Sequence, residues 1–198
     1  MQIKAIKLQP QEPFTWSSGW KSPIYCDNRV TLSDQGIRTF IKESLVDLVQ
    51  ERFEEVDVIA GVATAGVAQG AMIADLMNLP YAYVRPEPKG HGTGQQIEGR
   101  MEKGQKVVLV EDLVSTGGSS LKAVKAVRDA GCEVLGVVAI FDYGFGVAEK
   151  NFAEAKVPYY TLSNYEYLLP IAVEQGLVKQ DQLTLLQDWR KAPESWGR

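Results

Sequence analysis

Side chains that bind metals or form disulfides are scarce in this sequence. It contains two cysteines, Cys26 and Cys132, and one histidine, His91. The cysteines lie far apart, with neither a Cys-x-x-Cys spacing nor a neighbouring histidine, so the sequence predicts neither a disulfide framework nor a structural zinc site. We interpret Cys132 as a core residue.

Long apolar runs and an excess of one charge are also missing. No apolar run approaches the roughly 20 residues that a membrane-spanning helix needs, and the first residues, MQIKAIKLQP, lack the apolar core of a signal peptide. We therefore expect a cytoplasmic protein with no membrane partner. The 21 Lys and Arg residues against 25 Asp and Glu residues give a net charge of -4. Because these charges are evenly spread, a general nucleic-acid binder is excluded, and any phosphate affinity must be local.

What the sequence does contain is a recurring pattern of a short β-branched run, a glycine-rich turn and an amphipathic stretch. This pattern predicts strands at residues 56–60, 81–85, 106–110 and 133–141, and helices at 67–77 and 119–130. Strands separated by crossover helices indicate an α/β fold with a mostly parallel central sheet flanked by helices. The 198 residues, 45% of them hydrophobic, suit a single domain spanning 1–198. In such sheets ligands bind beyond the carboxyl ends of the strands.

The most informative stretch is VVLVEDLVSTGGSS, residues 107–120. Its apolar strand leads to two adjacent carboxylates, Glu111 and Asp112, and the small-residue loop 115–118 then opens directly into a helix. Backbone N–H groups of such a loop, with the positive end of the helix dipole, can bind a phosphate. The glycines and serines alone are as consistent with an ordinary strand-to-helix turn. The acidic pair favours a ligand that joins phosphate to a polyol, a cation or a developing positive charge, such as a ribose 5-phosphate.

Two nucleotide-binding motifs are excluded. The turn 61–66 has the two glycines of a P-loop but is followed by Val67 where lysine is required, and no Gly-x-Gly-x-x-Gly follows a strand. The turn is as consistent with a tight strand–helix connection as with a second anion site.

The segment 86–99, PEPKGHGTGQQIEG, has four glycines, two prolines and no periodicity, and it lies between predicted strands. A loop of this length inside a compact domain is usually disordered or a functional lid. Taken alone, its Lys89 and His91 are more simply interpreted as solvated residues.

Large aromatic residues cluster near both ends of the chain. Trp16, Trp20 and Tyr25 fit either a core or a platform on which a base stacks, and the core is the simpler interpretation. We interpret the stretch 165–173 and the terminal helix 183–189 as packing elements without chemistry.

Three stretches of the chain carry a family resemblance. Residues 107–120 resemble the motif of type I phosphoribosyltransferases that binds 5-phosphoribosyl diphosphate (PRPP). The stretch FTWSSGWKSPIYCDNR, residues 14–29, resembles the amino-terminal signature of the orotate phosphoribosyltransferases, and RPEPKGHGTGQQIEG, residues 85–99, is similar to their mobile catalytic loop. The resemblance covers most of the chain. It implies a Rossmann-like type I fold with a small amino-terminal hood, about residues 1–35, that contributes the orotate pocket, and a mobile catalytic loop at 86–98.

The resemblance implies transfer of a phosphoribosyl group from PRPP to orotate in de novo pyrimidine (UMP) biosynthesis, with Mg2+ carried mainly by PRPP and no metal site of the protein itself. It implies a homodimer whose loop is shared across the interface. Lys89, His91 and Asp112 would be catalytic, and Tyr25, Cys26 and Ser115 would bind orotate. The implied PRPP-binding residues are Arg85, Lys89, His91, Glu111, Asp112, Leu113, Val114, Ser115, Thr116, Gly117, Gly118 and Ser119.

The chain departs from the family pattern where many members carry a basic residue, at Ser17, Ala65, Pro86 and Tyr143. The partner of the orotate carboxylate is therefore open, with Arg29 or Lys21 as substitutes. The family usually has a helix before the Phe-Thr segment, so we expect a shortened form.

Two alternative functions stay open. One is a type I phosphoribosyltransferase for another base, such as a purine. The other is a non-enzymatic PRPP-sensing regulator, which would normally carry a basic DNA-contacting surface that this acidic chain does not show.

Overall fold

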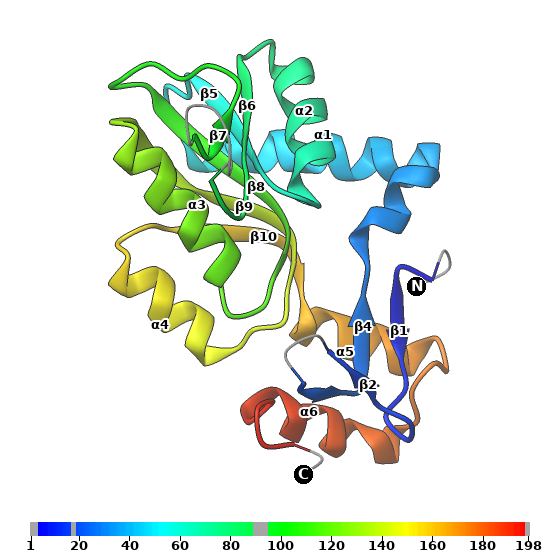
Figure 1. Ribbon diagram of the computed structural model, residues 1–198. Coiled ribbons are helices and arrows are strands. Elements are labelled where there is room, and N and C mark those ends of the chain that lie inside the picture. Colours follow the sequence, from blue (N-terminus) through cyan, green and yellow to red (C-terminus); the bar gives the residue numbers. More distant parts are fainter. Residues whose placement is uncertain (1–3, 17–18, 89–94, 197–198) are drawn as a thin grey trace.

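A six-stranded sheet forms the centre of the molecule (Figure 1). The computed structural model describes residues 4–16, 19–88 and 95–196. The strands, in the order in which they lie side by side, are β10 (Tyr159–Asn164), β9 (Glu133–Asp142), β8 (Lys106–Val114), β5 (Val58–Val62), β6 (Tyr81–Val84) and β7 (Ile97–Glu98). Neighbouring strands run parallel except β7, which is antiparallel to β6. The predicted α/β fold with a mostly parallel sheet is confirmed.

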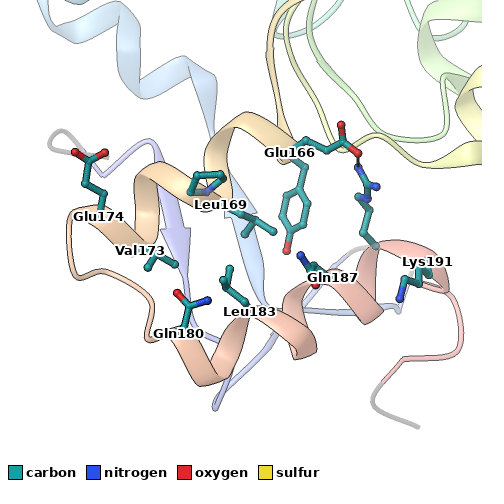
Figure 2. A pocket seen from close by; sticks show the side chains of 11 residues that line it. Glu166, Leu169, Val173, Glu174, Gln180, Leu183, Gln187 and Lys191 are labelled. Atoms are coloured by element: carbon teal, nitrogen blue, oxygen red, sulfur yellow. Dashed lines mark hydrogen bonds and ion pairs between the residues drawn. The ribbon is translucent and has the colours of Figure 1, made fainter.

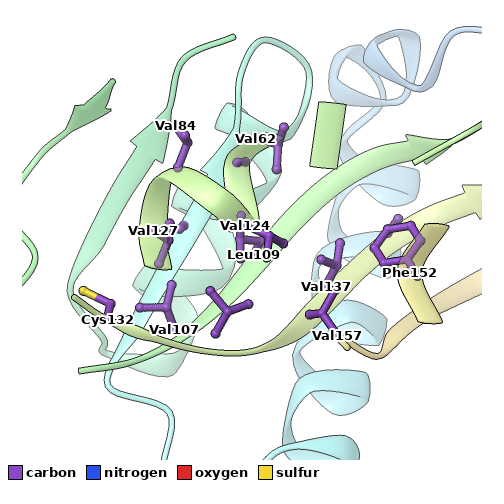
Figure 3. Close-up of a cluster of buried hydrophobic side chains, with 14 of the residues drawn as sticks. Val62, Val84, Val107, Leu109, Val124, Val127, Cys132, Val137, Phe152 and Val157 are labelled. Carbon is purple, nitrogen blue, oxygen red and sulfur yellow. The ribbon is translucent and has the colours of Figure 1, made fainter. Parts of the chain in front are cut away.

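Helices cover both faces of this sheet. α1 (Gln35–Arg52) and α2 (Gly66–Met77) pack on one face, and α3 (Gly118–Asp129) and α4 (Gly146–Glu154) pack on the other. Successive side chains of a strand point to opposite faces, so Val107 and Leu109 of β8 join the cluster with α3 and α4 (Figure 3), while Val108 and Val110 join the cluster with α1 and α2. Burial on both faces explains the unbroken apolar run of this strand.

The two ends of the chain form a small lobe beside the sheet (Figure 1). We define it by two antiparallel pairs, β1 (Ile6–Leu8) with β4 (Ile24–Cys26) and β2 (Phe14–Thr15) with β3 (Lys21–Ser22), and by α5 (Tyr165–Glu174) and α6 (Leu183–Lys191). Short 3-10 helices lie at η1 (Asn28–Ser33) and η2 (Gln180–Gln182). The indole of Trp189, fully buried in α6, donates to the carbonyl of Lys21 at 3.1 Å. The amino-terminal segment therefore packs on the carboxyl-terminal helices.

Several sequence-based predictions need correction. β5 is shifted two residues along from the predicted 56–60, because its pairing with β6 continues to Val62. β8 runs to Val114 rather than ending at 110, because β9 pairs with it as far as Asp142. α1, α4 and β10 were not predicted. Within the stretch interpreted as packing, Tyr165 is buried but Tyr167 is 70% exposed.

None of the helices in the described ranges is both long and apolar enough to cross a membrane.

Cys132 is buried at 7% exposure and belongs to the core, as expected.

Candidate active site

The turn between β8 and α3 is a short loop at the carboxyl edge of the sheet. Gly117 has φ +78°, and a Cβ atom there would lie 2.7 Å from the ring of Phe152, so only glycine fits this position. The carbonyl of Thr116 accepts from the Asn151 amide of α4 at 2.9 Å, which fixes the loop against the second helix. Gly118 and Ser119, where α3 begins, are exposed.

The first turn of α3 is suited to bind an anion. Gly117 is its N-cap, and no side chain of the described residues caps the helix there. The first N–H groups of an α-helix have no partner within the helix, and the helix dipole makes this end positive. A phosphate at this turn would therefore accept backbone hydrogen bonds that the protein itself leaves unused.

Glu111 lies inside β8 and is turned onto α3. Its Oε2 accepts from the hydroxyls of Ser119 (3.1 Å) and Ser120 (3.2 Å), and its Oε1 accepts from the backbone N–H of Asp112 (3.1 Å). The residue is 5% exposed, and burial, with the nearby charge of Asp112, raises the pKa of Glu111 to about 8. Because the carboxylate oxygens of Glu111 already accept these three hydrogen bonds, they have little acceptor capacity left for a ribose hydroxyl.

Asp112 is the more accessible carboxylate of the pair. It is half-buried, and burial raises the pKa of Asp112, although the Glu111 hydrogen bond and the charge of Arg29 oppose that rise. Its carbonyl accepts from Nδ2 of Asn28 at 2.7 Å. β5 pairs with β8 only as far as Val110. The Asn28 amide therefore donates a hydrogen bond to β8 beyond the point where its pairing with β5 ends.

A cavity of about 590 Å³ opens between this turn and the small lobe. Its lining residues are Thr15, Trp16, Trp20, Tyr25, Cys26, Leu113, Ser115, Thr116 and Tyr143. The volume lies in the range of small-molecule sites. The structure thus brings together all three residues predicted to bind orotate, Tyr25, Cys26 and Ser115. Trp16 and Trp20 are half-buried and pack against the core of the small lobe, as the core interpretation predicts. They also line the cavity, as the interpretation of a platform for a base requires.

Two titratable residues of the cavity are neutral. Burial raises the pKa of the Cys26 thiol to about 12, and Asp112 adds to the shift. Its Sγ donates to Oδ1 of Asn28 at 3.4 Å. Burial also raises the pKa of Tyr143 far above its usual range. The resemblance led us to expect a basic residue at the position of Tyr143, so this wall of the cavity carries a neutral phenol in place of the expected cation.

Arg85 lies near the second glycine-rich turn. A cavity of about 170 Å³ is lined by Val62, Ala63, Val84, Arg85, Pro86, Ser119, Lys122 and Ala123. Arg85 pairs with Glu98 across 3.3 Å, and its carbonyl accepts from the Gln96 amide at 2.7 Å. Lys89 and His91, the predicted catalytic pair, lie outside the described residues, as does Ser17.

Sequence reasoning missed Asn28 and Lys122. Asn28 stands within the stretch 14–29, but nothing in a single sequence indicates that its amide reaches a strand 84 residues away. Lys122 lies about one helical turn after the small-residue loop. Because Ser119 and Lys122 are three residues apart and share a helix face, their spacing could have indicated that Lys122 lies near the predicted phosphate site.

A larger cavity, about 680 Å³, lies between α5 and α6 (Figure 2). An ion pair between Glu166 and Arg190 stands at its edge, with 2.6 Å between Oε1 and Nη1. Of the predicted substrate-binding residues that the structure describes, none lines this cavity, and the walls of the cavity belong to the carboxyl-terminal part of the small lobe.

Comparisons with known proteins agree with the motifs. The model of the phosphoribosyl transferase domain family matches residues 32–164. Orotate phosphoribosyltransferase of Bacteroides fragilis is 57% identical over 196 residues, which cover 99% of this chain and 92% of that protein. The enzyme of the same name from Bacillus cytotoxicus is 54% identical over 198 residues, which cover 99% of this chain and 94% of that protein.

Solved structures give the same answer. The crystal structure of orotate phosphoribosyltransferase from Aeropyrum pernix is 31% identical and superposes with a TM-score of 0.77, covering 89% of this chain and 96% of that one. Adenine phosphoribosyltransferase from Leishmania tarentolae superposes with a TM-score of 0.62 at 21% identity, covering 83% of this chain and 85% of that one, which shows a shared fold only. Together with the full-length relatives, these matches establish that the chain belongs to the orotate phosphoribosyltransferases.

Proposed function

We propose that this chain transfers the 5-phosphoribosyl group of PRPP to orotate, giving orotidine 5'-monophosphate and diphosphate in de novo pyrimidine biosynthesis. One observation carries the proposal. The cavity that contains Tyr25, Cys26 and Ser115 opens directly beside the β8–α3 turn, so that a base in the cavity and a phosphate at α3 can belong to one nucleotide. The ribose then lies between them, beside Asp112.

The reaction replaces the bond between C1 of the ribose and the diphosphate by a bond to the ring nitrogen of orotate. The proton of that nitrogen is released, and the departing diphosphate is a base that can accept it. Positive charge develops on the ribose as the diphosphate leaves with the bonding electron pair. Because the pKa of Glu111 is raised to about 8, the negative charge of the acidic pair at neutral pH resides mainly on Asp112. A charge fixed beside the ribose stabilises the transition state more than the ground state. No protein nucleophile is required, since the base itself attacks.

The leaving diphosphate needs positive charge. We assign Arg85, Lys89 and His91 to this role, and the small cavity that both Arg85 and Ser119 line supports it for Arg85. Within the described residues, no three His, Cys, Asp or Glu side chains are grouped to hold a metal ion. Mg2+ keeps most of its water and phosphate ligands and needs few protein ligands, so we assign it mainly to the oxygens of PRPP. When bound with PRPP, the ion supplies further positive charge against the diphosphate.

The assay that tests the proposal follows orotate loss in the presence of PRPP and Mg2+, with hypoxanthine and adenine as alternative bases. Among the three bases, we expect turnover of orotate only, and we expect no turnover when PRPP is omitted. Turnover of a purine in place of orotate would contradict the assignment. Tight PRPP binding without turnover of any base would favour the regulator instead.

The proposal includes a cytoplasmic homodimer in which the loop 86–98 of one subunit completes the site of the other. Lys89→Ala is expected to lower kcat on the order of a hundredfold or more, because a charge on the leaving group counts most in the transition state. Asp112→Asn should also impair turnover while the fold persists.

Mixing the two inactive variants tests the shared site. If the loop crosses the interface, a mixed dimer has one site with both substitutions and one site with neither. Random reassortment then restores roughly a quarter of the wild-type activity. A loop that acts on its own subunit gives no recovery, because every site keeps one substitution. Proven subunit exchange without recovery would therefore exclude the shared loop and leave the orotate assignment standing.

A further inference from the structure

Among the residues that the structure describes, none with a positive charge lines the cavity assigned to the base. All of its lining residues are uncharged, and Cys26 and Tyr143 are held neutral by burial. Asp112 adds negative potential, since its charge further raises the pKa of both groups. Orotate carries a carboxylate, and an anion buried without a partner is strongly disfavoured. If the proposed function holds, this carboxylate needs a partner, and a cation at a neighbouring position would supply it.

Arg29 is one cation close to the cavity, but its charge is already paired. Its Nε and Nη2 donate to the two carboxylate oxygens of Asp27 at 2.7 and 2.9 Å. The guanidinium also holds the pKa of Asp27 below its usual range, as expected for a bidentate pair. Binding a second carboxylate would require Arg29 to leave this contact.

Lys21 differs from Arg29 in having no carboxylate partner among the residues that the structure describes. It lies directly opposite Thr15 in the β2–β3 pair, and its Nζ donates to Oγ1 of Thr15 at 2.8 Å. Thr15 lines the cavity. The Lys21 carbonyl accepts a hydrogen bond from the buried indole of Trp189. This contact holds the backbone of Lys21 against α6.

We propose that Lys21 is the specificity-determining cation that binds the carboxylate of the base. The Thr15 hydroxyl accepts from the ammonium group, so its own proton is free to be donated. Lys21 and Thr15 therefore place a positive charge and a hydroxyl donor side by side at one wall of the cavity, where both can reach the same carboxylate. The neutral Tyr143 completes the cavity wall by packing, and it contributes no charge.

The test compares binding of orotidine 5'-monophosphate with binding of UMP, which differ only by the carboxylate. Lys21→Met removes the charge and keeps the apolar stem. We expect the ratio of the UMP and orotidine 5'-monophosphate dissociation constants to fall about 10- to 100-fold, the range of a charged hydrogen bond. The KM for orotate should rise by a similar factor, while the KM for PRPP and kcat at saturating orotate stay within about threefold.

Lys7→Met is the matched control, because Lys7 is an exposed cation of the small lobe that lies opposite Tyr25 in the β1–β4 pair. It should leave the ratio unchanged, and Lys21→Arg should preserve most of the preference. Lys21→Gln provides a second neutral variant if Lys21→Met folds poorly.

Either of two results would overturn the inference. The first is an unchanged ratio in folded Lys21→Met or Lys21→Gln. The second is a ratio that falls in Arg29→Met instead. Failure of the proposed function is a separate outcome, because the wild-type protein would then show no preference for orotidine 5'-monophosphate at all.

Discussion

The two sides of the candidate site are built in different ways. The phosphate side is one contiguous stretch, β8 with its turn and α3, in which β8 lies between β5 and β9 and is buried on both faces. The base side combines the turn after β8 and Tyr143 with side chains of the amino-terminal segment, and α6 packs behind them; the amino-terminal side chains are Thr15, Trp16, Trp20, Tyr25 and Cys26. The difference teaches that a phosphate site can be encoded by local backbone conformation, whereas a base site depends on how distant segments pack.

Aromatic packing holds the base side together. The ring of Trp16 lies 5.0 Å from Tyr143 and 5.7 Å from Trp189, measured between centroids. Phe145 stacks on Tyr143 at 5.5 Å and contacts Trp189 edge-on at 5.3 Å. Such contacts add to the free energy of burial. Substitutions in α6 should therefore affect the base side selectively.

The largest expected effect is that of Trp189→Ala. Truncating this fully buried ring should lower the free energy of unfolding by about 3–5 kcal/mol, measured by urea denaturation. In the folded fraction, the KM for orotate should rise more than the KM for PRPP. Trp189→Phe keeps most of the packing but loses the hydrogen bond to Lys21, so it separates the two contributions. Equal increases in both KM values would show that the two sides are not independent.

Gly117→Ala is the matching change on the phosphate side. It combines a positive φ with a Cβ atom placed 2.7 Å from the Phe152 ring, which should cost about 2–4 kcal/mol and raise the KM for PRPP. The preference for orotidine 5'-monophosphate over UMP should stay unchanged. Gly104→Ala is the control, because Gly104 has φ +89° but no atom within 4 Å of its Cβ position. Similar results for the two variants would mean that the contact with Phe152 is unimportant.

Asn28→Ala tests the junction between the two sides. It leaves the carbonyl of Asp112 without its amide donor, which should cost about 1–3 kcal/mol of stability. Because Asn28 connects Cys26 to Asp112, the KM values for orotate and PRPP should both rise. Thr31→Val is the control, since it removes a buried hydrogen bond to the Asn28 carbonyl without touching Asp112. If the control impairs catalysis equally, the effect of Asn28 is one of general stability.

The most gradual effect expected is a pH dependence of stability from Glu111, because it is spread over several pH units. Its pKa is raised from 4.5 to about 8, so between these values the folded protein holds a proton that the unfolded chain has released. The free energy of unfolding should therefore fall as pH rises from about 4.5 to 8 and level off above that. Glu111→Gln should flatten this slope in denaturant titrations at several pH values. An unchanged slope would assign the dependence to other groups, such as Asp112.

Part of this structure could be predicted from the sequence, and part could not. Alternation, glycine-rich turns and helical periodicity predicted the central strands and the helices α2 and α3 to within about two residues at most of their ends. The end of β8 was wrong because strand length depends on the partner strand, and β9 extends the pairing to Val114. The contact between Asn28 and Asp112 joins residues 84 positions apart, which no local pattern records.

The sequence by itself determined the order of the α/β units and the position of the acidic pair ahead of a glycine turn, because backbone conformation and side-chain period act over a few residues. Only the tertiary structure decided that Glu111 turns onto α3, that Asn28 reaches the carbonyl of Asp112, and that Trp189 supports Lys21 from 168 residues away. These features arise from packing between segments that are distant in the sequence. They depend on the free energy of closing the long loops between these segments and on how well their surfaces fit, and neither is recorded in a local sequence pattern.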